Sequence, residues 1–270
     1  ANVGNELQVW GLQNPASPIP SLAPRWHWLA WVTRVGTRVA PSPQSTLPYD
    51  LLLPLGWKSP ASVIDPEKTL PANPYAIDDG RLWTAVQERG LVPPNNATDP
   101  ARKIYQSETG QILIAAPRNL LVLDTPRTAG GFAPIGQPLR APQGGVEVVT
   151  SGSDATVWVS ALDQHPIRQS RRLLATHLTD LQNTGIRYAE PERRTLQDWG
   201  SLPYLVRAGK ADLTIRLDHA RRCRVWALEP GGKRLAEVPV RSEDNALRFQ
   251  VNVAADPAAG ARMLYEIAVE

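Results

Sequence analysis

Polar side chains that could carry out acid–base chemistry or hold a ligand gather between residues 177 and 198. The group consists of His177, Asp180, Asn183, Glu190 and Asp198. Glycoside hydrolysis needs two carboxyl groups, about 5–5.5 Å apart in retaining enzymes and about 6.5–9.5 Å apart in inverting ones. The same cluster would also suit a structural ion-pair network or a solvated rim. We therefore assign no catalytic residue and treat His177, Asp180 and Asn183 as candidate substrate-binding residues.

His177 lies near the end of an apolar run, residues 172–178, whose alternation predicts a strand. On such a strand its side chain shares a face with Leu173. An unpaired polar group buried there costs on the order of 1–3 kcal/mol, so we expect a partner from the polar loop that follows, such as Asp180 or Asn183. The favoured interpretation is a hydrogen-bonded histidine that fixes this loop against an adjoining domain.

No metal site is predicted. The sequence has four histidines, none of them spaced as a pair, whereas zinc needs three or four converging ligands. Calcium held by Asp180, Asn183 and backbone carbonyl groups stays an alternative, because oxygen ligation leaves little trace in a sequence. Phosphate-loop and dinucleotide-binding glycine patterns do not occur either, and no cofactor is expected.

The tryptophans allow two interpretations, since sugar-binding proteins present exposed aromatic rings to pyranose faces and other tryptophans are buried. Trp57, Trp83 and Trp199 lie in polar or Pro/Gly-rich surroundings and are candidate sugar contacts. For Trp199, packing is the favoured alternative. Trp158 and Trp226 lie inside alternating segments, which predicts that they belong to the core.

Charge and cysteine content narrow the classes of partner. The net charge of +3 on 270 residues is too small to indicate a nucleic-acid partner. Arg127 could join the arginine pairs along the chain in an anion-binding surface, and it is kept as a candidate substrate contact. Salt-bridged edge positions are the favoured interpretation of the arginine pairs. The single cysteine, Cys223, lies in an alternating segment and is predicted to be a buried, unreactive thiol.

The elements that position these residues change character near residue 100. From about residue 104 the hydrophobic period is two, and turn-forming residues separate short segments. One of these connections, Ser-Gly-Ser-Asp at 151–154, is interpreted as a hairpin turn. The predicted strands are 111–115, 120–125, 146–150, 156–162, 172–178, 211–217, 224–229, 234–241, 247–253 and 263–269. Many short strands at this spacing indicate an all-β, antiparallel β-sandwich. The Gly/Pro-rich segment 130–145 is interpreted as a crossover between the sheets.

Residues 1–100 are rich in proline and show no sustained alternation, which disfavours strands inside a sheet. Apolar residues at three- and four-residue spacing predict a helix over 22–39 and a second over 79–90, the latter ending at a Gly90 cap. We expect this part to be a joining segment with one or two helices, followed by the sandwich over 101–270. Because the chain starts at Ala1 and contains one methionine, it is expected to be a processed product or a fragment.

Several motifs carry a family resemblance because they occur in order. They are Pro-Asn-Asn-Ala-Thr-Asp at 94–99, Ser-Glu-Thr-Gly at 107–110, Asp-Thr-Pro-Arg-Thr at 124–128, Ala-Thr-Val-Trp-Val-Ser at 155–160, Thr-His-Leu-Thr-Asp at 176–180 and Leu-Pro-Tyr-Leu-Val-Arg at 202–207. From about residue 91 to its end the chain resembles the β-sandwich that closes large bacterial glycoside hydrolase-like proteins. In these proteins the sandwich follows a catalytic (β/α)8 barrel.

The resemblance implies a secreted or periplasmic protein that works on polysaccharides with a catalytic barrel domain or chain as its partner. A barrel alone takes about 250 residues, so a chain of 270 residues committed to strands leaves no room for one. The function expected is that of a non-catalytic ancillary module, with no nucleic-acid and no membrane partner. Two alternatives stay open: a glycoside hydrolase that uses Asp or Glu residues of the 180–198 region, and a free-standing carbohydrate-binding module.

Overall fold

The computed structural model describes residues 83, 84, 87, 88, 90, 92–107, 109–191, 193 and 195–270. The chain divides into two compact units, residues 1–125 and 126–270. The helix expected over 22–39 and the candidate Trp57 lie outside the described residues, and the boundary expected near residue 100 stays a prediction. Of the segment 79–90, the described residues 83, 84, 87 and 88 are helical. Gly90 has a φ of +63°, as a left-handed helix cap requires.

Three antiparallel strands form the described sheet of the first unit. They are β1 (Ile104–Gln106), β2 (Ile112–Ala115) and β3 (Leu120–Asp124). The hairpin expected between residues 111 and 125 is confirmed. Its turn is a short 3₁₀ segment, Ala116–Arg118, closed by Asn119 in the left-handed region at a φ of +48°.

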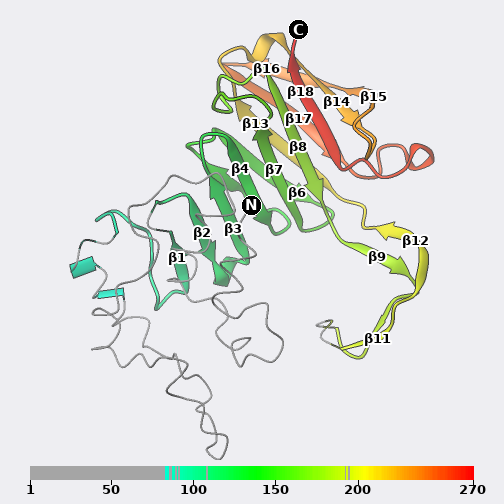
Figure 1. The fold of residues 1–270 in the computed structure, drawn as a ribbon, viewed down its shortest axis with the longest axis horizontal. Helices are drawn as coiled ribbons and strands as arrows, with labels where there is room; N and C mark the ends of the chain where they lie inside the picture. Colours follow the sequence, from blue (N-terminus) through cyan, green and yellow to red (C-terminus); the bar gives the residue numbers. More distant parts are fainter. Residues whose placement is uncertain are drawn as a thin grey trace, which may run out of the picture. The chain divides into compact units, whose positions relative to one another are not determined.

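Two antiparallel sheets build the second unit, which confirms the predicted all-β class (Figure 1). The larger sheet of this unit runs in the order β4 (Thr128–Ala133), β7 (Ala155–Ala161), β8 (Arg172–Leu178), β18 (Leu264–Val269), β14 (Cys223–Leu228) and β15 (Arg234–Val238). The smaller sheet runs β16 (Val240–Glu243), β17 (Ala246–Asn252), β13 (Lys210–Arg216), β6 (Val146–Ser151) and β5 (Leu139–Ala141).

Alternation along the strands produces the core of this unit. In β7 every second residue is fully buried, and Val157 and Val159 have no exposed surface. The same pattern in β13 buries Leu213 and Ile215. Cys223 is buried as expected, and burial raises its thiol pKa to about 11. Among the described residues, no helix has the length and apolarity to cross a membrane.

Two connections differ from the sequence interpretation. The segment 130–145 contains most of β4 and all of β5, so the crossover between the sheets is limited to residues 134–138. The turn at residues 152–154 joins β6 to β7, which belong to different sheets, and it is therefore not a hairpin. The turn at Asp244 and Asn245 is a true hairpin, because both residues have positive φ and Glu243 pairs with Ala246.

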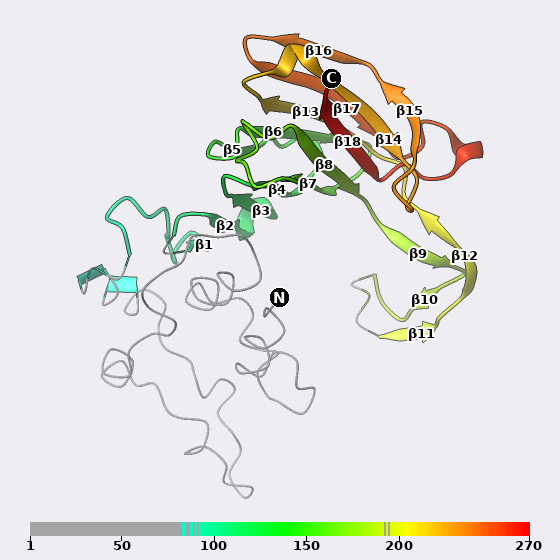
Figure 2. The same cartoon turned by 45° about the horizontal axis from the view of Figure 1, so that its top comes forward.

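An arm that is two strands wide follows β8, where the sequence suggested only a polar loop. Its strands are β9 (Leu181–Thr184), β10 (Arg187–Tyr188), β11 (Leu196–Asp198) and β12 (Ser201–Val206). β9 pairs with β12, and β10 pairs with β11, both antiparallel. Figures 1 and 2 show this arm standing away from both sheets of the second unit. The loop prediction was wrong because the strands are short and mix polar with apolar residues.

Candidate functional site

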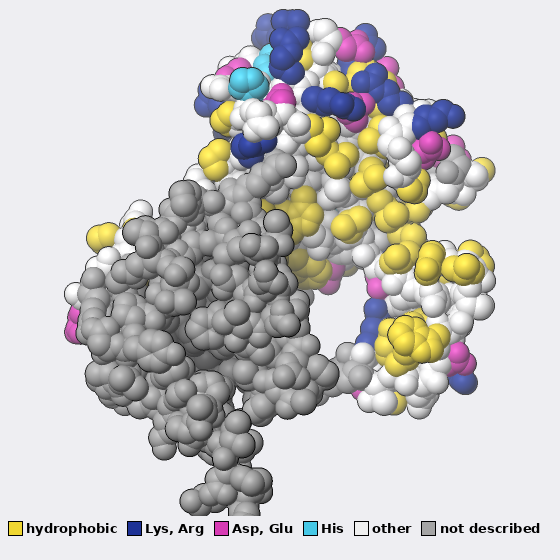
Figure 3. Space-filling model, viewed as in Figure 1, with side chains coloured by type: hydrophobic (Ala, Val, Ile, Leu, Met, Phe, Trp, Pro, Cys, Tyr) yellow, Lys and Arg dark blue, Asp and Glu magenta, His cyan; other side chains and the backbone are white. Residues whose placement is uncertain are grey.

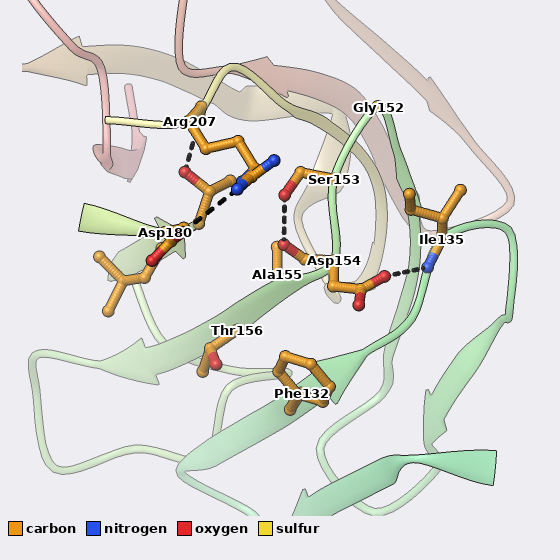
Figure 4. Close-up of a pocket in the computed structure, with 11 residues that line it drawn as sticks. Phe132, Ile135, Gly152, Ser153, Asp154, Ala155, Thr156, Asp180 and Arg207 are labelled. Carbon is orange, nitrogen blue, oxygen red and sulfur yellow. Dashed lines mark hydrogen bonds and ion pairs between the residues drawn. The ribbon is translucent and has the colours of Figure 1, made fainter. Parts of the chain in front are cut away.

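A pocket of about 450 Å³ opens in the second unit, where β8 ends and the arm begins. Figure 4 shows Phe132 and Thr156 on one side of this pocket, with Asp154, Asp180 and Arg207 around it. The turn at residues 152–154 forms a further wall. The pocket therefore collects side chains from the ends of β4 and β7 and from the base of the arm.

Asp180 is the most strongly bound carboxylate of this site. Arg193 donates to both of its oxygens, at 3.0 and 2.7 Å, and Gln182 and Arg207 donate to Oδ2 at 2.7 and 3.3 Å. The hydrogen bond from Arg193 is the main cause that lowers the Asp180 pKa to about 2. This carboxylate stays ionised at neutral pH and is unsuited to donating a proton. Its occupied oxygens also argue against the alternative of a calcium ligand.

His177 does not meet the partner expected for it. Its ring lies on the buried face of β8 with no exposed surface, as the alternation predicted. Within the described residues neither ring nitrogen has a hydrogen-bond partner, and Asp180 is engaged by arginines instead. Burial lowers the His177 pKa to about 4 because the charged imidazolium would lose its hydration. The histidine is therefore a neutral core residue.

Trp199 and Asn183 come together at the turn between β11 and β12. The Asn183 side chain donates to the Trp199 carbonyl oxygen at 2.8 Å, while the indole is 73% exposed. Among the described residues, the Trp199 ring is therefore not packed into the arm, in contrast to the favoured alternative. Gly200 makes the turn possible, because its φ is +66° and a β-carbon there would overlap the Thr184 carbonyl oxygen.

The other candidates lie apart from the pocket. Arg127 donates to the Asp163 carbonyl at 2.6 Å and to Gln164 at 3.0 Å, and its backbone carbonyl accepts from Ala161 at the far end of β7. This arginine fixes a loop. Trp83 belongs to the first unit, where it is 9% exposed. It is too deeply buried to stack on a sugar ring.

Three pocket residues were missed by the sequence interpretation. Phe132 was placed in a crossover, Asp154 in a hairpin turn, and Arg207 carried no signal of its own. The register of the larger sheet brings the first of them into place, since Phe132 pairs with Thr156 and Thr156 pairs with Leu178. The motif at residues 202–207 contains Arg207, but it was identified for its family resemblance and not for a binding role.

The outer face of the larger sheet carries a group of large apolar side chains among polar and charged ones. Half-buried side chains on this face are Phe132, Trp158, Leu174, Thr176 and Trp226. The expectation that Trp158 and Trp226 belong to the core was therefore wrong: they occupy the alternate positions of strands whose other residues fill the core. Figure 3 shows hydrophobic side chains gathered over β8 and β18 and continuing along the arm.

Two groups of charged side chains lie on this face, one around Glu266 and one formed by Arg224 and Glu237 at 3.1 Å. Glu266 is 7% exposed in its side chain and accepts from Arg172 at 2.6 Å and from Arg234 at 2.7 Å. Burial alone would raise the Glu266 pKa, but the two guanidinium groups outweigh it and lower the pKa overall. Arg234 also stacks over the Trp226 ring at 3.6 Å from its centroid.

Comparison with known proteins identified no relative of the chain. No family model, no curated protein and no solved structure matches the chain.

Proposed function

We propose that the chain is a non-catalytic ancillary module of a bacterial glycoside hydrolase, whose second unit packs on a catalytic (β/α)8 barrel domain or chain. The family resemblance of the ordered motifs supplies the class of enzyme. The proposed setting is secreted or periplasmic.

The observation that carries the proposal is the exposed apolar surface of the arm. Its large hydrophobic side chains are 53–73% exposed, namely Leu181, Trp199, Leu202, Tyr204 and Leu205. Exposed apolar surfaces of this kind mark protein contacts. Covering them with a partner removes apolar area from water, which stabilises the complex as burial of side chains stabilises a core.

Charges along the arm favour an uncharged partner surface. Arg187 pairs with Asp198 at 3.2 Å, and Arg193 and Arg207 pair with Asp180. With Arg194, Glu190 and Glu192 counted as well, residues 180–207 contain four arginines and four carboxyl groups, so this segment has no net charge. A partner would therefore meet mainly leucine and aromatic side chains, as in the apolar centre of a stable interface.

The carboxyl groups support a module without its own catalysis. Among the described residues, every carboxyl group with a shifted pKa has it lowered, and these are Asp163, Asp180, Asp198 and Glu266. A glycosidase needs one carboxylic acid whose pKa is raised so that it can protonate the leaving oxygen. The surroundings of these four groups lower the carboxyl pKa and so favour the ionised form.

The test begins with the gene, which we expect to encode a (β/α)8 barrel on the same product or beside it. Purified barrel and purified chain are then mixed, and binding is measured by calorimetry. The double variant Leu202→Ser/Tyr204→Ser should weaken binding at least about tenfold. The matched control Leu162→Ser/Leu235→Ser changes two exposed side chains outside the arm and should bind as the parent does.

Two outcomes would contradict the proposal. One is equal binding by both double variants. The other is release of reducing sugars from a polysaccharide by the chain alone, abolished by Asp180→Asn, which would favour the glycoside hydrolase alternative.

A carbohydrate-binding module is the second candidate, favoured by the 73% exposure of the Trp199 ring. Exposed indoles stack on the apolar face of pyranose rings. Retention on an insoluble polysaccharide that Trp199→Ala abolishes would support this candidate.

A further inference from the structure

The pocket at the base of the arm has a built apolar floor. Phe132, Thr156 and Leu178 lie side by side on β4, β7 and β8, because Phe132 pairs with Thr156 and Thr156 with Leu178. Directly paired side chains on one face of a sheet are neighbours. The floor thus joins one aromatic ring, one methyl-bearing hydroxyl group and one leucine, and the Phe132 ring is half-buried on it.

Asp154 supplies a fixed acceptor above this floor. Its Oδ1 accepts from the Ile135 backbone N–H at 2.9 Å, which orients the carboxylate (Figure 4). Within the described residues, Oδ2 has no hydrogen-bond partner. A ligand hydroxyl group could donate to it without displacing any protein contact.

Arg207 supplies donors on the other side. One of its Nη atoms donates to Asp180 at 3.3 Å, and its backbone carbonyl accepts from the Thr179 hydroxyl at 2.6 Å. The backbone and one corner of the guanidinium group are therefore held. Its Nε and its other Nη have no partner in the described part of the chain, so they stay available to a ligand oxygen.

The charges of the pocket balance. Asp154 and Asp180 carry two negative charges, and Arg207 and Arg193 carry two positive ones. An anionic ligand would be repelled by the free Asp154 oxygen, and a cationic one by Arg207. A neutral ligand with hydroxyl groups that donate and accept, and with one apolar face, satisfies the floor and both polar walls.

We propose that this pocket binds a pyranose unit of a neutral oligosaccharide or polysaccharide. The volume of about 450 Å³ lies in the range of about 300–1,000 Å³ common for small-ligand sites. The sugar ring lies against Phe132, with one hydroxyl group donating to Asp154 and another accepting from Arg207. The choice of a sugar rests on the proposed function, whereas the demand for a neutral polyol follows from the pocket itself.

The experiment titrates the chain with soluble oligosaccharides from cellulose, xylan, mannan, galactan and agarose, using calorimetry and saturation-transfer NMR. Asp154→Asn is the sharpest variant, because the amide oxygen can still accept from Ile135 while the free acceptor becomes a donor. We expect it to weaken binding about tenfold or more. Phe132→Ala should remove the saturation transfer to the sugar ring protons.

Trp199→Ala is the matched control at the arm turn and should bind as the parent does. If Trp199→Ala abolishes binding and Asp154→Asn does not, the sugar sits on the arm and the pocket assignment is overturned. Absence of binding to every member of the panel also overturns it. Both results concern sugar binding, whereas the assay with Leu202→Ser/Tyr204→Ser measures binding to the barrel. The pocket proposal and the proposed function can therefore fail independently of each other.

Discussion

The sheets and the arm of the second unit use similar residues in opposite ways. Leu213, in the middle of β13, is 1% exposed, whereas Leu205 in β12 is 53% exposed. Both lie on antiparallel strands, where Leu213 pairs with Phe249 and Leu205 pairs with Gln182. The difference is the second layer: the sheets cover each other, while the arm has only two strands across its width.

This contrast shows that apolar residues in a strand do not by themselves make a core. A two-stranded ribbon is at most marginally stable alone in water, so the arm depends on the sandwich at its base. Its exposed leucines add little to that stability. Their presence is better explained by a partner surface than by folding.

The largest effect is expected from the core leucine. Leu213→Ala should lower the free energy of unfolding by about 2–5 kcal/mol, because it leaves a cavity between the sheets. Leu205→Ala removes the same atoms from an exposed site and should change it by less than about 0.5 kcal/mol. Urea unfolding of both variants checks the pair. Equal losses would mean that the arm is part of the cooperative core.

The buried His177 should make the sandwich sensitive to acid. Its pKa is about 4 in the folded chain against an ordinary value of 6.5, so between these values only the unfolded state binds the proton. Stability is therefore unaffected above about pH 6.5, falls as the pH is lowered toward 4, and loses about 3 kcal/mol in total.

The control for this prediction is His177→Leu, which removes the titrating group and the unpaired nitrogens. Unfolding free energies of parent and variant, measured across the same pH range, should diverge as the pH falls. Parallel curves would show that the ring finds a partner or stays hydrated in the folded chain.

A smaller effect is expected at the ion pairs. Glu266→Gln should cost about 1–3 kcal/mol, since its carboxylate is shielded and holds Arg172 and Arg234 on the outer face. Asp198→Asn on the arm breaks an exposed pair and should produce no measurable change in global stability. Thermal unfolding of the two variants compares them, and a larger loss at Asp198 would reverse the contrast.

The smallest global effect is expected from Gly200→Ala. The added methyl group overlaps backbone atoms at the arm turn, so the arm should open while the sandwich keeps its stability. Hydrogen exchange of the β9 and β12 amides should accelerate. Gly185→Ala is the matched control, because Gly185 also has positive φ, at +74°, but has open space around its β-position. Equal acceleration in both variants would point to backbone strain alone.

Much of the fold could be predicted because strand signals are local. The alternation in 172–178 matches β8 at both ends, and the Asp244–Asn245 dipeptide marks a hairpin with the required left-handed residues. β4 could not be predicted, because two glycines interrupt its pattern. Gly130 is needed there, since a β-carbon would overlap the backbone of Val157 on the neighbouring strand.

The candidate site was predicted only in part. His177 was placed on the correct face of its strand, and Asp180 was singled out as a residue of the site. The contact expected between them does not form, because Arg193 and Arg207 bind Asp180 instead. A carboxylate gains more from two guanidinium groups than from a neutral imidazole. Such competition between partners depends on distances that a sequence does not contain.

By itself, the sequence determined which residues alternate, where the chain turns and that the sandwich is all-β, because these properties depend on neighbours along the chain. The tertiary structure alone decided which strands receive a covering layer and which apolar positions stay uncovered. It left Trp158 and Trp226 on the outer face, the arm leucines exposed, and Phe132 beside Asp154 and Arg207. Burial and pairing depend on strands brought together from distant positions, and that choice is made only when the sheets pack.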